Sequence, residues 1–250
     1  MWEDGAMKWK TAISRHDGDK TFVREKKLSS LVGKTTFSEA TFLVLRGRKP
    51  NKKEGVLFDA LLVSAIEHGI ETPSAYVART AVSTGNEMHT ALAAGILSFG
   101  KWHGGAVEEA AKLFARPEDA ATLVNMFLVR KEKLPGFGHK LYKEKDPRAQ
   151  ALLALGEKLL SRHKHTDKAR GIENELEKQS GKKLPINIEG AMGACMLELG
   201  FDPLIGKALF AFARTPGLIA HIHEEALYEK PYRRLLSEDI EYRNENREHQ

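Results

Sequence analysis

The sequence predicts an all-α protein with one short β-hairpin near its N-terminus. Along most of the chain, apolar residues recur three and four positions apart, which places them on one face of a helix. Two Asp-Pro pairs, at 146–147 and 202–203, each offer a capping carboxylate followed by a proline preset for the first helical turn. Residues 9–25 differ, because their Asp17-Gly18 pair is typical of a hairpin turn.

The helices are expected in the following order. Residues 53–68 place five apolar side chains on one face, and Gly69 ends that helix. Residues 86–100 repeat the pattern as far as Gly100. A further helix begins after Pro117, where two acidic residues suit the free amides of a first turn. Helices then follow at about 147–161, 188–199, 203–214 and 217–229. The polar and basic residues 162–185 are interpreted as surface helix or linker, and the charged tail from Ser237 as peripheral.

Composition narrows the class of protein. The chain has 250 residues, of which 42% are hydrophobic and 29% charged, as in ordinary globular proteins. No apolar run reaches the ~20 residues of a membrane span, and the first ten residues lack the apolar segment of a secretory signal. The single cysteine, Cys195, cannot form a disulfide within the chain, so a reduced cytoplasm is the expected compartment. The net charge of +5 comes from scattered cations, which favours a small polyphosphorylated ligand over nucleic acid.

Three segments carry the candidate chemistry. The first, LPGFGHKLYKEKDPR (134–148), joins a Gly-x-Gly turn to His139 and to a helix start. The second, KWHGGA (101–106), places His103 before two glycines, although alone such a histidine is more often structural. The third, PINIEGAMGA (185–194), holds Glu189 among small and apolar residues. A carboxylate there is costly unless paired or functional, and burial would raise its pKa.

These segments resemble the active-site segments of the citrate synthase superfamily. The resemblance runs from residues 11–20 to 230–234. The segments PSAYVARTAVSTG, WHGGAVEEAAKLF and ARTPGLIAHIHEE look closer to citryl-CoA lyases and to the lyase domain of ATP-citrate lyase. The resemblance implies a large helical domain (residues 1–103 and 197–250) with an inserted small helical domain (104–196), and closure of the cleft between them would exclude water.

The resemblance also implies catalytic roles for three residues. His103 matches the donor to the thioester carbonyl oxygen, and His139 matches the group that serves the oxaloacetate carbonyl. In cleavage, His139 would accept the hydroxyl proton. Glu189 would deliver a proton to the enolate carbon, and it stands where citrate synthases have aspartate. Its extra methylene implies a pocket rebuilt around glutamate, a different substrate or direction, or loss of activity, since misplacement of about 1 Å can cost about 100-fold.

Binding roles follow from the same resemblance. His68, within an Asp-His-Glu-like segment, matches a histidine that contacts oxaloacetate, although a histidine near a helix end can instead be satisfied by the helix dipole. Arg148 and Arg214 match arginines that hold substrate carboxylates; each could otherwise be a surface cation. An arginine near residues 230–233 could serve a neighbouring subunit. The loop that matches the coenzyme A-binding loop consists of Pro135, Gly136, Phe137 and Gly138. No metal is expected, because His221 and His223 are two positions apart and face different sides of a helix.

The function expected from this resemblance is cleavage of citryl-CoA to acetyl-CoA and oxaloacetate. Coenzyme A then enters as part of the substrate, and no metal or membrane takes part. One alternative is a citrate synthase or a related enzyme that condenses an acyl-CoA with a 2-oxo acid. Another is a non-catalytic module that binds coenzyme A or a partner subunit. We also expect a homo-oligomer built from dimers, because the apolar faces of 91–97 and 204–212 exceed what one subunit can bury.

Overall fold

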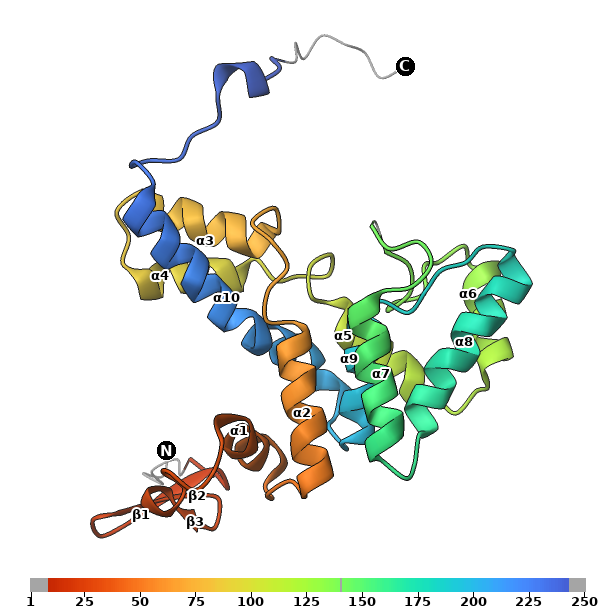
Figure 1. The fold of residues 1–250 in the computed structure, drawn as a ribbon, viewed down its shortest axis with the longest axis horizontal. Helices are drawn as coiled ribbons and strands as arrows, with labels where there is room; N and C mark the ends of the chain where they lie inside the picture. The colour runs from red at the N-terminus through yellow and green to blue at the C-terminus, as the bar shows by residue number, and fades with distance from the viewer. Residues whose placement is uncertain (1–8, 140, 243–250) are drawn as a thin grey trace, which may run out of the picture. The chain divides into compact units, whose positions relative to one another are not determined.

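The computed structural model describes residues 9–139 and 141–242. Residues 1–8, on which part of the signal-peptide prediction rests, lie outside this range. The described chain is mostly helical with a small N-terminal sheet, so the all-α prediction is confirmed (Figure 1). Strands β1 (Ser14–Asp17), β2 (Lys20–Val23) and β3 (Lys26–Lys27) pair antiparallel in that order. Gly18 has a φ of +57° in the turn, so the expected hairpin is present and a third strand extends it.

The helices occupy the rest of the described chain. Their bounds are α1 Phe37–Arg46, α2 Lys52–Ser64, α3 Pro73–Ser83, α4 Met88–Leu97, α5 Ala106–Ala115, α6 Ala120–Val129, α7 Pro147–Leu159, α8 Lys164–Ser180, α9 Ile188–Glu198 and α10 Gly206–Tyr228. Asp146 caps α7 and Asp202 caps the short turn before α10, as their Asp-Pro pairs predict. The segment interpreted as surface helix or linker contains α8. The two helices expected at 203–214 and 217–229 form the single helix α10, which contains Pro216.

The chain divides into two compact units. One comprises residues 1–65 and 104–213, and the other comprises 66–103 and 214–250. This division shares the boundary after His103 with the predicted large and small domains, but it groups residues 1–65 with 104–213. The predicted assignment of a large and a small domain stays a prediction.

The core of the first unit surrounds α9. Eight residues of this helix are buried, from Ile188 to Met196 with the exception of Glu189. Gly193 lies so close to α5 that an added Cβ would sit 3.0 Å from the Ala111 amide nitrogen. Cys195 is also buried here, its Sγ lies 3.9 Å from the Leu152 carbonyl, and burial raises the pKa of its thiol. The small residues of α9 therefore serve close helix packing.

The second unit is built from α3, α4 and part of α10. Its buried core consists of Ala75, Ala78, Ala91, Leu218 and Ile222. Gly95 permits the close approach of α4 and α3, since an added Cβ would lie 3.0 Å from the Ala78 Cβ. This packing fixes the loops that enter and leave α3 and α4, and those loops carry two of the predicted site residues, His68 and His103.

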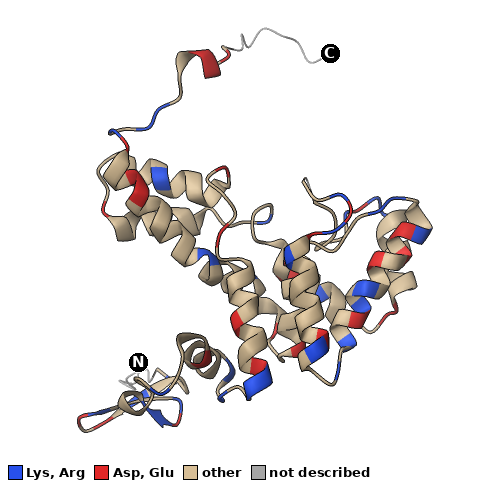
Figure 2. Ribbon diagram, viewed as in Figure 1, with Lys and Arg blue, Asp and Glu red and all other residues tan. Residues whose placement is uncertain are grey.

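Charges are mixed along the surface helices, as Figure 2 shows for α8. That helix carries both cationic and acidic residues, for example Lys164, Asp167, Lys168 and Glu173. None of the helices in the described part of the chain has the length and hydropathy needed to cross a membrane.

Candidate active site

The predicted site residues are distributed over both units. His68, His103 and Arg214 belong to the unit made of 66–103 and 214–250. His139, Arg148 and Glu189 belong to the other, together with the loop 135–138.

His103 follows α4 in a tight turn. Its backbone pairs with Gly100 through two hydrogen bonds of 3.0 and 3.2 Å, and its ring stacks on Phe99 with centroids 4.6 Å apart. The Nε2 atom lies 2.9 Å from the Ser74 hydroxyl oxygen. Donation by Ser74 to Nε2 would leave the ring proton on Nδ1, where it could serve a ligand. Ser74 is a partner that no spacing in the sequence indicated.

The pKa of His103 is lowered. Burial is the main cause, and the charges of Arg214 and His68 add to it. The three predicted residues of this unit are thus close enough to act on one another. A lowered pKa keeps the His103 imidazole neutral at neutral pH, which is the form suited to hold a developing enolate oxygen.

Arg214 is deeply buried in α10, with 2% of its surface exposed. The alternative of a surface cation is therefore wrong for this residue. Guanidinium groups are seldom buried unless they meet an acceptor, so burial is consistent with a binding role.

Arg148 is held by a fully buried carboxylate. Asp146 accepts hydrogen bonds from the Arg148 backbone nitrogen (3.0 Å), Nε (3.2 Å) and Nη2 (2.9 Å). It also accepts one from the Ile188 backbone nitrogen (3.1 Å), at the start of α9. Burial acts to raise the pKa of Asp146, but the hydrogen bonds and charge of Arg148 lower it overall. The sequence indicated Asp146 only as a helix cap; in the structure it also ties α7 to the helix that carries Glu189.

His139 is oriented by two backbone amides. Its Nδ1 atom accepts hydrogen bonds from the backbone nitrogens of Leu141 (3.0 Å) and Tyr142 (3.1 Å). Because Nδ1 accepts, the neutral ring carries its proton on Nε2. The pKa of His139 is lowered, mainly by burial, so the neutral form is favoured. The predicted role of proton acceptor does not fit this tautomer, which makes Nε2 a hydrogen-bond donor.

The loop 135–138 packs against the start of α9. Gly136 has a φ of +85°, and an added Cβ there would lie 2.7 Å from the Gly190 Cα. The Gly136 carbonyl accepts from the Asn187 backbone nitrogen (3.0 Å), and the Asn187 side chain donates to the Gly138 carbonyl (2.9 Å). The backbone that approaches this turn closely is thus the chain's own, at Gly190. Binding of coenzyme A by the loop stays a prediction.

Glu189 lies in the first turn of α9 and is half-buried. The Asn187 side chain caps this helix by accepting from the Gly190 backbone nitrogen at 3.1 Å. Free amides at a helix start stabilise a negative charge nearby. The cap, the loop 135–138 and Asp146 together fix the backbone from which Glu189 projects.

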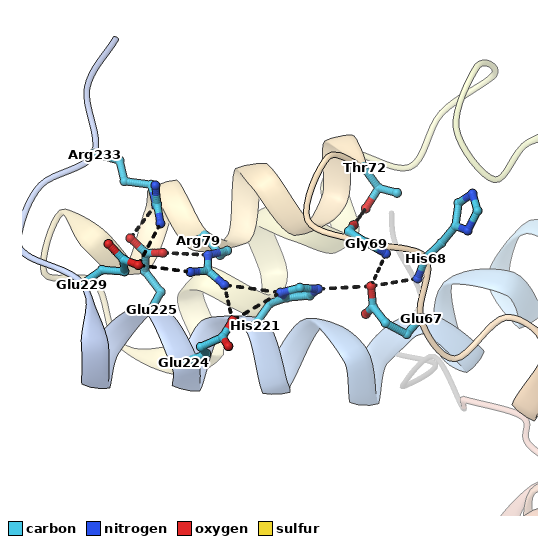
Figure 3. Close-up of polar contacts among 10 residues, drawn as sticks. All are labelled: Glu67, His68, Gly69, Thr72, Arg79, His221, Glu224, Glu225, Glu229 and Arg233. Atoms are coloured by element: carbon cyan, nitrogen blue, oxygen red, sulfur yellow. Dashed lines mark hydrogen bonds and ion pairs between the residues drawn. The ribbon is translucent and has the colours of Figure 1, made fainter. Parts of the chain in front are cut away.

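His221 lies in α10. It contacts Glu67 and Arg79 (Figure 3). Within residues 9–139 and 141–242, no group of three or more His, Cys, Asp or Glu side chains is arranged to hold a metal ion.

Comparisons with known proteins agree with these motifs. The model of the citrate synthase C-terminal domain matches residues 34–235. Citrate synthase of Saccharolobus solfataricus is 34% identical over 199 residues, which make up 76% of this chain and 52% of that protein. The chain therefore spans about half the length of the curated relatives it matches.

Two solved structures extend the comparison. Citryl-CoA lyase from Hydrogenobacter thermophilus is 39% identical, with a TM-score of 0.91, and the match covers 97% of each chain. Citrate synthase from Thermoplasma acidophilum, in a ternary complex with carboxymethyl coenzyme A and oxaloacetate, is 28% identical. Its TM-score is 0.72, over 84% of this chain and 58% of that one. The family model matches most of the sequence, and the chain belongs to the citrate synthase family.

Proposed function

We propose that this protein cleaves citryl-CoA to acetyl-CoA and oxaloacetate. The observation that carries the proposal is the match with the citryl-CoA lyase of Hydrogenobacter thermophilus, which extends over 97% of both chains at a TM-score of 0.91. Citrate synthase of Saccharolobus solfataricus is matched over 52% of its length.

The reaction needs three kinds of group. Cleavage breaks the carbon–carbon bond between the hydroxyl-bearing carbon and the methylene beside the thioester. The hydroxyl gives its proton to a water molecule and becomes the oxaloacetate carbonyl. The methylene becomes an enolate that takes up one proton from an acid, and solvent then reprotonates that acid. One hydrogen-bond donor must hold the thioester oxygen, and another must hold the hydroxyl oxygen. An acid must supply a proton to the enolate carbon.

The neutral histidines suit the two donor roles. In the proposal, His103 donates to the thioester oxygen while Ser74 holds its Nε2 (2.9 Å). His139 donates from Nε2 to the oxygen that turns from hydroxyl to carbonyl, because its Nδ1 is occupied by two amides. Both histidines have lowered pKa values, mainly through burial. Glu189, in its protonated form, delivers a proton to the enolate carbon and regains one from solvent.

The cationic residues suit the carboxylates of the substrate. Arg148, held by Asp146, and the buried Arg214 are assigned to the carboxylates of the oxaloacetate part. His68 is assigned to the same part. The accessible residues of the loop 135–138 are assigned to coenzyme A.

A citrate synthase is the second candidate. It is favoured by the 34% identity to the Saccharolobus solfataricus enzyme. Condensation uses the same carbon–carbon step in reverse, but a synthase then hydrolyses the thioester and releases free coenzyme A. A longer carboxylate at Glu189 occupies space near the reacting carbon, which we expect to disfavour the placement of a hydrolytic water.

Product analysis tests the proposal. Citryl-CoA should yield acetyl-CoA and oxaloacetate with little free thiol, and a mixture of acetyl-CoA and oxaloacetate should release thiol slowly at most. Rapid stoichiometric thiol release from that mixture would establish the synthase instead.

Glu189→Gln separates an enzyme from a non-catalytic module. The variant should still bind coenzyme A but should lose the exchange of acetyl-CoA methyl protons with solvent. Parental protein that binds coenzyme A and shows neither exchange nor cleavage would favour the non-catalytic alternative.

A further inference from the structure

One carboxylate oxygen anchors the loop that carries His68. The Oε1 atom of Glu67 accepts hydrogen bonds from the backbone nitrogens of His68 (2.7 Å) and Gly69 (2.6 Å). It also lies 3.1 Å from the Nε2 atom of His221 on α10 (Figure 3). Two consecutive amides on one acceptor restrict the backbone torsions between them, and Gly69 completes the turn with a φ of +94°.

His221 connects this carboxylate to a buried arginine. The Nδ1 atom of His221 lies 3.4 Å from Nη1 of Arg79. Arginine can only donate, so Nδ1 is the acceptor and Nε2 carries the ring proton toward Glu67. Burial acts to raise the pKa of Glu67, but hydrogen bonds from His221 and from the Gly69 and His68 amides lower it overall. Glu67 is therefore an anionic acceptor for all three donors.

Arg79 is itself fixed within the unit. It is 4% exposed, and its Nε donates to Glu225, which is 1% exposed, at 2.7 Å. Its Nη1 donates to Glu224 at 2.5 Å. On the far side of Glu225, the Arg233 Nε completes the ion-pair chain at 2.6 Å. Arg233, which sequence comparison suggested for a neighbouring subunit, is thus engaged within its own chain.

The side chain of His68 lies outside this chain of contacts. Figure 3 shows its imidazole directed away from Glu67, while its backbone nitrogen faces the carboxylate. The His68 imidazole is near enough to His103, in the same unit, for its charge to contribute to the lowered pKa of His103, after burial and the charge of Arg214. Movement of the 67–69 backbone would therefore redirect the imidazole.

We propose that Glu67 is a positioning residue for His68, held in place by His221 and Arg79, and that it sets the affinity for the oxaloacetate part of the substrate. The inference rests on the proposed function, in which His68 contacts that part. Glu67 acts through the backbone of His68 and does not itself touch the substrate.

The test is a double-mutant cycle on oxaloacetate binding. Isothermal titration calorimetry with oxaloacetate, in the presence of coenzyme A, compares the parental protein with Glu67→Ala, His68→Ala and the double variant. We expect each single variant to bind about 10-fold more weakly, and the double variant to bind as His68→Ala does. Glu67→Gln, which keeps an oxygen for the two amides, should recover most of the affinity.

The loop provides a matched control. Glu71→Ala removes the same charge from an exposed position four residues away and should leave oxaloacetate affinity unchanged. If Glu67→Ala does not fold, as judged by circular dichroism, His221→Phe replaces it in the cycle, since phenylalanine keeps a ring but offers no donor to Glu67.

The possible outcomes distinguish failure of the site assignment of His68 from failure of the positioning role of Glu67. Normal affinity in His68→Ala would remove His68 from the proposed site, and the inference with it. Two results would overturn the positioning role alone, provided that His68→Ala binds more weakly. In the first, Glu67→Ala keeps parental affinity; in the second, the losses of the two single variants are fully additive. Either result would leave the proposed function unaffected.

Discussion

Substitution of Gly190 by alanine tests whether the start of α9 positions the candidate site. The new Cβ would lie 2.4 Å from the Gly136 carbonyl oxygen, about 1.0 Å closer than the 3.4 Å at which ordinary contacts begin. That oxygen also accepts from the Asn187 backbone nitrogen, so the hydrogen bond must change too. Overpacking of this kind costs about 1–3 kcal/mol, against a gain of up to about 1 kcal/mol from helix propensity.

The same substitution should impair catalysis more than stability. To relieve the close contact, the loop that precedes His139 and the helix that carries Glu189 must move apart by about 1 Å. Misplacement of that size can cost about 100-fold in rate. Urea unfolding followed by circular dichroism measures the free energy of unfolding, and citryl-CoA cleavage measures kcat/KM.

Gly55→Ala is the matched control for Gly190→Ala. It lies in α2, where an added Cβ would meet its nearest neighbour, the Pro50 Cγ, at an ordinary 3.7 Å. We expect its free energy of unfolding to stay the same or rise by up to about 1 kcal/mol. Equal stability and equal activity in Gly55→Ala and Gly190→Ala would refute the reasoning.

Three further predictions concern the site and the assembly. His103→Ala and His139→Ala should each lower kcat by about 100- to 1,000-fold in the cleavage assay while circular dichroism stays unchanged; near-parental rates in both would remove them from the site. Because the pKa of His103 is lowered, kcat should fall only below the ordinary histidine pKa of about 6.5. The stability that the neutral ring contributes is present above that pH and should decline as pH falls. A kcat–pH profile whose acid limb begins above pH 7 would contradict this. Light scattering at micromolar concentration should show a homo-oligomer built from dimers. Leu97 lies at the end of the apolar helix α4 and is 84% exposed, so Leu97→Asp should weaken the assembly. A monomeric parental protein would contradict the expectation.

The sequence was informative where short-range chemistry decides the structure. The Asp-Pro pairs led to the caps of α7 and of the turn before α10, because a capping carboxylate acts within three residues. The break expected near Pro216 was wrong. Proline disfavours a helix interior, but α10 continues through it, and Gly217 lets the helix lie against the 66–67 segment: an added Cβ would be 2.4 Å from the Ile66 carbonyl oxygen.

Motif resemblance could single out candidate residues but not the groups that contact them. Motif resemblance singled out His103, His139 and Arg148. The contact of Ser74 with His103 and the hydrogen bond from the Ile188 backbone nitrogen to Asp146 both depend on tertiary structure. The hydroxyl of Ser74 is 29 positions from His103, and no local periodicity joins the two. The tautomer of His139 could not be predicted from the sequence either, because it depends on hydrogen bonds from two backbone amides of the following turn.

The buried thiol of Cys195 has a practical consequence for these measurements. Reaction of a cysteine with a thiol reagent requires the thiolate form and access to solvent. Cys195 is fully buried, and burial raises the pKa of its thiol, so neither requirement is met. In an assay that counts coenzyme A thiol, the native protein should therefore contribute no rapid background. Slow labelling of Cys195 would instead report how often the packing around α9 opens, which makes the single cysteine of the sequence a built-in probe of the core that supports Glu189.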